Sequence, residues 1–132
     1  MNVPPRILVV EDNTVLAEVL RLNLHRAGFE VTVASNGALA LKRLQEHGFE
    51  LLITDFQMPG IDGGELCQRV RRELHMQELP ILMCTAKGLE IQVDQLKSEL
   101  GLSRIVFKPF SMRDIVRSAR ELTAAQPIVA QI

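Results

Sequence analysis

Five side chains that can do chemistry stand at, or directly after, the end of an apolar run. They are Glu11, Asp12, Asp55, Thr85 and Lys108. Three carboxylates, one hydroxyl and one primary amine can together hold a metal ion and contact an anionic group. They can do so only if the fold brings these distant parts of the chain together.

Three carboxylates in one site need positive charge. Two like charges about 4 Å apart repel by roughly 4 kcal/mol at an effective dielectric constant near 20, so one carboxylate would take up a proton unless a cation lay among them. Lys108 supplies one positive charge. Because every candidate ligand is an oxygen, we predict that Mg²⁺ supplies the rest, with Mn²⁺ as a substitute. Mg²⁺ commonly adds phosphate oxygens to its ligands, so the site suits phosphoryl chemistry.

Each of these residues also has a structural explanation when it is taken alone. Asp12 and its neighbour Asn13 could cap a helix. Asp55 could be a turn residue. Thr85 could be an ordinary β-branched strand residue, and Lys108 a solvated loop lysine. The chemical interpretation therefore depends on their convergence.

Short apolar runs recur along the chain and indicate strands. They cover residues 7–10, 31–34, 51–54, 81–84 and 105–107. Several are solidly apolar, which is typical of parallel strands covered on both faces. Because amphipathic segments of helical length separate the runs, we predict an α/β fold, a five-stranded parallel sheet with five helices on its two faces. The carboxyl ends of such strands share one edge, where ligands bind.

The expected helices have recognisable ends. The first two cover residues 14–27 and 37–47 and should stop at Gly28 and Gly48. The first should bury one face, made of Leu16, Val19, Leu20 and Leu24. Asp62 and Glu65 have capping-box spacing and open the third helix. A fourth has leucine and valine at three-four spacing over 89–100, and Ser111 with Asp114 caps a fifth.

Size and charge limit the classes of protein to consider. The 132 residues suit one compact domain, which we place at 1–124 with a C-terminal tail at 125–132. A net charge of −1 argues against binding to nucleic acid or an anionic membrane. We expect the dense basic run at 69–72 to be a solvated helix face that pairs with Glu73.

The two cysteines, Cys67 and Cys84, lie in different apolar segments. Isolated buried thiols are typical of a reducing compartment. Neither a signal peptide nor a bilayer-spanning stretch is apparent. We therefore expect a cytoplasmic protein.

Four segments carry a family resemblance. They are ILVVEDN at 7–13, LLITDFQMPGIDG at 51–63, ILMCTA at 81–86 and FKPF at 107–110. In this order, on successive strand ends, they resemble the receiver domain of two-component response regulators over about residues 5–123. The resemblance implies a flavodoxin-like fold with strand order 2-1-3-4-5.

The resemblance also implies a role for each site residue. Asp55 would be the phosphoacceptor, which receives a phosphoryl group from a phosphohistidine of a partner kinase. Asp12 and Asp55 would ligate Mg²⁺ directly, with the backbone carbonyl of Gln57. Glu11 would act on the same ion through a water molecule.

Two further residues would contact the phosphoryl group itself. Lys108 would neutralise phosphoryl oxygens, and Thr85 would hydrogen-bond one of them. In the family, the peptide bond between this lysine and Pro109 is often cis.

The implied partners are a sensor histidine kinase or phosphotransfer protein and a downstream output domain or protein. Homodimers through the fourth and fifth helices are common in the family. No direct contact with nucleic acid or a membrane is expected. Such a domain promotes only its own phosphorylation and dephosphorylation, so we do not expect an enzyme acting on other substrates.

One position departs from the family pattern. Many receivers carry Tyr or Phe three residues before the lysine, and this chain has Ile105. A β-branched isoleucine cannot reproduce the rotation of a large ring. We therefore hypothesise that the signal passes through the loop at 86–91.

Three other functions fit parts of the pattern. A Mg²⁺-dependent phosphatase or phosphotransferase for small molecules would commonly carry D-x-D, whereas this chain has Asp55-Phe56-Gln57. A flavodoxin-like cofactor binder would need a phosphate cradle, and the first loop, EDNT at 11–14, is acidic. A receiver-like domain that is never phosphorylated would lack some site residue, and here each position is filled.

Overall fold

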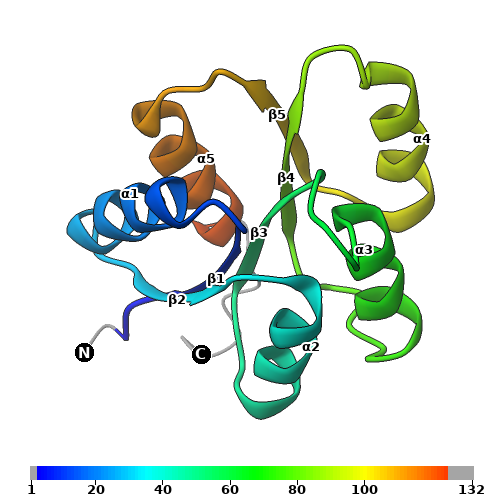
Figure 1. Cartoon of the computed structure of the whole chain (residues 1–132). Coiled ribbons are helices and arrows are strands. Elements are labelled where there is room, and N and C mark those ends of the chain that lie inside the picture. The colour runs from blue at the N-terminus through cyan, green and yellow to red at the C-terminus, as the bar shows by residue number, and fades with distance from the viewer. Residues whose placement is uncertain (1–2, 125–132) are drawn as a thin grey trace.

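The computed structural model of the chain describes residues 3–124 (Figure 1). Strands and helices alternate throughout. The strands are β1 (Arg6–Val10), β2 (Glu30–Ala34), β3 (Leu51–Asp55), β4 (Ile81–Ala86) and β5 (Arg104–Lys108). The helices are α1 (Thr14–Arg26), α2 (Gly37–Glu46), α3 (Gly63–Arg72), α4 (Glu90–Leu100) and α5 (Met112–Ala124). The segment assigned to a tail, 125–132, lies outside the described residues, and the domain boundary stays a prediction.

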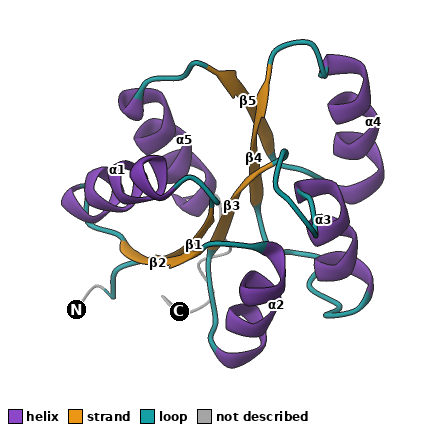
Figure 2. Cartoon of the chain, in the orientation of Figure 1, coloured by secondary structure: helices purple, strands orange, loops and turns teal. Residues whose placement is uncertain are grey.

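The strands form one parallel sheet in the order β2-β1-β3-β4-β5. Helices α1 and α5 cover one face of the sheet, and α2, α3 and α4 cover the other (Figure 2). The predicted fold class and the strand order implied by the family resemblance are both confirmed.

A separate apolar core lies on each face of the sheet. Alternate residues of β1 divide between them: Leu8 and Val10 pack towards α2, α3 and α4, and Ile7 and Val9 towards α1 and α5. Strand β3 is buried along its whole length. Burial on both faces explains the solidly apolar runs in the sequence.

The helix ends follow the predicted chemistry with one exception. Asn13 and Asp62 accept hydrogen bonds from the backbone N–H groups of Leu16 and Glu65. Gly28 follows α1 at a φ of 103°, a left-handed conformation that suits glycine. The prediction of a glycine stop at Gly48 was wrong, because α2 ends at Glu46 and His47 is already extended, at φ −138° and ψ 153°.

Two sequence-based placements of side chains need correction. Val19 was assigned to the buried face of α1, but it is 39% exposed. The basic run was expected to be solvated, but Arg71 is only 6% exposed. Its guanidinium donates to the carbonyls of Met76, Leu100 and Gly101 at 2.7, 2.8 and 3.0 Å. Arg71 therefore joins α3 to the end of α4, while Arg69 pairs with Glu73 as expected.

Membrane insertion can be tested only on the described helices. Within residues 3–124, none of them combines the length and apolarity that crossing a bilayer requires. The two cysteines are buried and free, and burial raises the pKa of each thiol to about 12.

Candidate functional site

The carboxyl ends of the central strands bring the predicted site residues together. Glu11 and Asp12 directly follow β1, and Asp55 is the last residue of β3. One carboxylate oxygen from each of these three residues lies within 4.8 Å of the others. Lys108, the last residue of β5, reaches the same cluster from the far side of β4.

At the junction of β1 and α1, one residue caps the helix and its two predecessors are left for the site. Glu11 donates its backbone N–H to the carbonyl of Ala34, which continues the ladder to β2. Its buried carboxylate accepts the backbone N–H of Asn13 at 3.1 Å. Asn13 caps α1 with its own side chain. Capping thus explains Asn13 but not Asp12, whose carboxylate stays exposed beside Asp55.

The β3–α3 connection holds Asp55 at the sheet edge. Phe56 donates its backbone N–H to Cys84 at 2.8 Å, so the ladder between β3 and β4 continues past Asp55. The start of α3 then approaches very closely. A Cβ on Gly63 would lie 2.4 Å from the Asp55 carbonyl oxygen and 2.8 Å from the Phe56 Cα, so only glycine fits there.

Lys108 is the cation of the cluster. Its Nζ lies 3.0 Å from Asp55 Oδ1 and 3.8 Å from Glu11 Oε1. The following Lys108–Pro109 peptide bond is cis, as the family resemblance suggested. The contact with Asp55 is an ion pair. Among the described residues, the buried Asp55 Oδ1 finds no hydrogen-bond partner.

The negative charge of the cluster exceeds its positive charge. Burial raises the pKa of Asp55, Lys108 lowers it in part, and the Asp12 charge raises it further. Burial also raises the pKa of Glu11, to which the Asp55 charge adds. Burial acts to lower the pKa of Lys108, but Asp55 and Glu11 together raise it. One ammonium therefore does not neutralise the three carboxylates.

A divalent cation fits this arrangement. The cluster offers three carboxylate groups within a few ångströms of one another, and Asp55 Oδ1 is buried without a hydrogen bond. Oxygen ligands of this kind suit Mg²⁺. A cation among them would favour the charged form of each carboxylate and so lower the raised pKa values of Glu11 and Asp55. The carbonyl of Gln57 as a further ligand stays a prediction.

Thr85 is fully buried near the end of β4 and does not stand alone. The Gln57 side chain donates from Nε2 to Thr85 Oγ1 at 3.2 Å, and its Oε1 accepts the backbone N–H of Ala86 at 3.4 Å. The family resemblance placed Gln57 beside the phosphoryl site, as a position that influences phosphoryl lifetime and offers its backbone carbonyl to the metal. The contact of its side chain with Thr85 and Ala86 was not predicted. No local sequence pattern predicts this contact, because Gln57 follows β3 and Thr85 lies in β4, 28 residues further along the chain.

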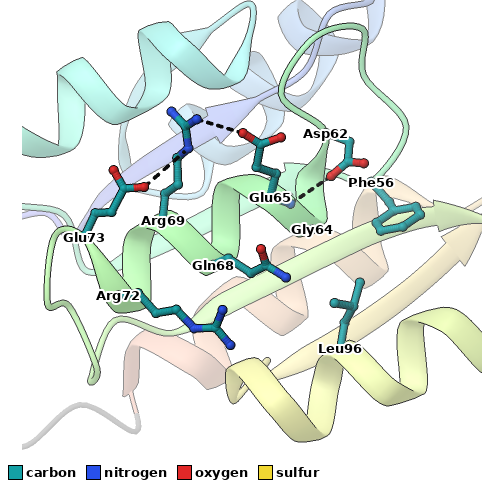
Figure 3. A pocket seen from close by; sticks show the side chains of 9 residues that line it. All are labelled: Phe56, Asp62, Gly64, Glu65, Gln68, Arg69, Arg72, Glu73 and Leu96. Atoms are coloured by element: carbon teal, nitrogen blue, oxygen red, sulfur yellow. Dashed lines mark hydrogen bonds and ion pairs between the residues drawn. The ribbon is translucent and has the colours of Figure 1, made fainter.

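A groove of 670 Å³ lies next to the site but does not contain it. It runs between α3 and α4, with Phe56, Gly64 and Leu96 on one side (Figure 3). On its rim, Arg69 pairs with Glu65 and Glu73 at 2.9 and 3.5 Å. None of the three clustered carboxylates lines this groove, so the chemistry belongs to the sheet edge.

A doubly wound parallel sheet carries an acidic cluster and a lysine at the carboxyl ends of its strands. These features define the class: an α/β domain with a candidate metal site at that edge of the sheet. The sequence profile of the response regulator receiver domain matches residues 7–120. The chain therefore belongs to the response regulator receiver domain family.

Individual relatives agree with this family. The chain is 42% identical over 127 residues to the phosphate regulon transcriptional regulatory protein PhoB of Rhizobium meliloti, covering 95% of this chain and 55% of that protein. It is 36% identical over 125 residues to the alkaline phosphatase synthesis transcriptional regulatory protein PhoP of Bacillus subtilis, covering 95% and 51%. The chain thus spans about half the length of these curated relatives.

A solved structure shows the same architecture. Response regulator protein TrrA from Thermotoga maritima, in complex with Mg²⁺-BeF, superposes with a TM-score of 0.78 at 30% identity. The match covers 89% of this chain and 98% of that one.

Proposed function

We propose that this receiver domain is a phosphorylation switch in which Asp55 accepts a phosphoryl group in a Mg²⁺-dependent reaction. One observation carries the proposal: the buried Asp55 carboxylate ends β3 beside two more carboxylates and 3.0 Å from the Lys108 amine. Family membership and the Mg²⁺-BeF complex of the related TrrA support it.

The transfer step needs little covalent machinery from the protein. The donor is a phosphohistidine of a sensor histidine kinase or phosphotransfer protein. A carboxylate oxygen of Asp55 attacks phosphorus as the phosphorus–nitrogen bond breaks. The new oxygen–phosphorus bond gives an acyl phosphate, and the electron pair of the broken bond stays on the imidazole nitrogen. The domain promotes its own phosphorylation and dephosphorylation and turns over no other substrate.

The surrounding residues supply position and charge, which dominate catalysis of phosphoryl transfer. Mg²⁺ bound at this site would supply positive charge to the phosphoryl oxygens. Asp12, Asp55 and the Gln57 carbonyl would hold it directly, and Glu11 would act through water. Lys108 places its ammonium where negative charge develops, and the Thr85 hydroxyl would donate a hydrogen bond to a phosphoryl oxygen.

We propose that the phosphorylated domain controls a downstream output domain or partner protein, without itself contacting nucleic acid or a membrane. Pairing of two chains through α4 and α5 is an arrangement that the family offers. The cytoplasm stays the expected location.

A small-molecule phosphatase is the alternative from the enzyme class. The residue two positions after Asp55 is Gln57, which cannot serve as the general acid of a D-x-D enzyme.

Stoichiometry distinguishes the switch from the enzyme. The purified chain with Mg²⁺ would be incubated with acetyl phosphate and, separately, with a free phosphate ester, with chelated metal as the control. The proposal predicts at most one phosphoryl group per chain and no sustained ester hydrolysis. Release of many equivalents of alcohol from the ester would instead establish the enzyme.

A further inference from the structure

The Gln57 side chain forms a bridge between the ends of β3 and β4. Its amide nitrogen donates to Thr85 Oγ1 at 3.2 Å, and its amide oxygen accepts from the Ala86 backbone N–H at 3.4 Å. One side chain thus contacts two successive polar groups of β4. We call this pair of hydrogen bonds the Gln57 bridge.

The Gln57 bridge occupies the strand end beside Asp55. Cys84 pairs with Asp55 in the sheet register and accepts the Phe56 N–H at 2.8 Å. The next groups of β4 towards the edge are therefore the Thr85 hydroxyl and the Ala86 N–H. A phosphoryl group on Asp55 would extend past the same edge, and its oxygens would need donors from this stretch.

The bridge acts differently on the two donors. The Ala86 N–H has a single hydrogen, and Gln57 Oε1 accepts it. The Thr85 hydroxyl keeps its own hydrogen, but Gln57 Nε2 fixes the position of its oxygen. A phosphoryl oxygen that takes the Ala86 N–H must therefore displace the Gln57 amide.

We propose that the Gln57 side chain is a placeholder that a phosphoryl group on Asp55 must displace from Ala86 and Thr85. This inference rests on the proposed function. Gln57 is then a positioning residue that opposes phosphoryl binding through its side chain, separately from its backbone carbonyl. Its release also frees an amide on the 56–62 connection, so phosphorylation changes the surface there as well as at β4.

Hydrogen exchange tests the bridge without metal or phosphoryl group. In metal-free protein, Gln57→Met keeps the length of the side chain and the backbone carbonyl but removes the side-chain amide, with both Nε2 and Oε1. We expect the Ala86 amide to exchange severalfold faster in this variant. Gln68→Met is the matched control, because Gln68 lies on α3 and lines the groove between α3 and α4. Unchanged exchange at Ala86 would overturn the placeholder.

Titration with beryllofluoride in Mg²⁺, followed by amide spectra, tests the competition. Neutral hydrogen bonds each contribute modestly, so Gln57→Met should bind this phosphoryl mimic about fivefold more tightly than wild type, or about 1 kcal/mol. Equal or weaker binding would refute the placeholder and leave the proposed function intact. Failure of wild type itself to bind would refute the proposed function, and this inference with it.

Discussion

At the scale of single residues, the Asp55 carboxylate is where stability and chemistry conflict. It is 5% exposed, and its Oδ1 lacks a hydrogen bond among the described residues. Burial raises its pKa, which means that the folded protein disfavours the charged form. Such an unfavourable charge suits a group that becomes phosphorylated and is screened by a cation, and it is typical of functional sites.

Removing this charge should therefore stabilise the metal-free protein. We expect Asp55→Asn to raise the free energy of unfolding by about 1 kcal/mol at pH 7, since Glu11 remains beside Lys108. The raised pKa means that protonation of Asp55 stabilises the fold fully below the ordinary value of 3.8, and this contribution is lost as pH rises through the raised value. The advantage of the variant should thus grow with pH.

Urea unfolding in chelator across a pH series measures this effect. Asp94→Asn, a change at an exposed position on α4, serves as the control. Wild type at least as stable as Asp55→Asn at pH 7 would contradict the account of Asp55.

Arg71 is the second residue with a clear energetic role. Its guanidinium satisfies three backbone carbonyls at the junction of α3 and α4. Arg71→Met should lower the free energy of unfolding by about 2–4 kcal/mol, because the buried contact with Leu100 and the two part-buried contacts with Met76 and Gly101 are lost. The neighbouring exposed change Arg72→Met should stay within about 0.5 kcal/mol of wild type. Equal effects in thermal or urea unfolding would show that the Arg71 contacts contribute little.

At the scale of elements, the site depends on how closely α3 approaches the end of β3. Gly63→Ala would place a methyl group 2.4 Å from the Asp55 carbonyl oxygen. We expect a loss of about 1–3 kcal/mol in stability and weaker Mg²⁺ binding, because Asp55 must shift. Gly48→Ala, where a Cβ would meet nothing within 4 Å, is the matched control. Mg²⁺ titration of both variants measures it, and normal binding by Gly63→Ala would contradict this role.

The path by which phosphorylation changes the structure beyond β4 also depends on how the strands, helices and loops pack. Ile105 packs half-buried against the core under α4, so no aromatic ring occupies the position three residues before Lys108. We expect beryllofluoride with Mg²⁺ to shift amide resonances through residues 86–91, as the loop hypothesis requires. Shifts confined to the metal site, with none beyond Thr85, would contradict it.

At the scale of the whole molecule, the sequence predicted the architecture because strand burial and helix capping are local signals. Solid apolar runs marked the strands, and polar residues at their ends marked one edge. Because the carboxyl ends of parallel strands lie at the same edge of a sheet, these polar residues could be assigned to one site from the sequence alone. The family motifs then supplied the order of the strands.

The sequence could not predict contacts that only the assembled fold creates. In the sequence, Arg71 is one of several charges in a basic run. Its burial could not be predicted, because it depends on where α4 ends. The Gln57 side chain reaches a strand that lies 28 residues further along the chain. Gly48 was predicted to stop α2, but the helix ends at Glu46 because His47 is already extended.

The central claim is that Asp55 accepts one phosphoryl group when Mg²⁺ is present. The most direct measurement is intact mass after incubation with acetyl phosphate, on wild type, Asp55→Asn and Asp94→Asn, each with Mg²⁺ and with chelator. We predict one phosphoryl group on wild type and on Asp94→Asn with Mg²⁺, and none on Asp55→Asn or without the metal. Equal incorporation into wild type and Asp55→Asn would contradict the account.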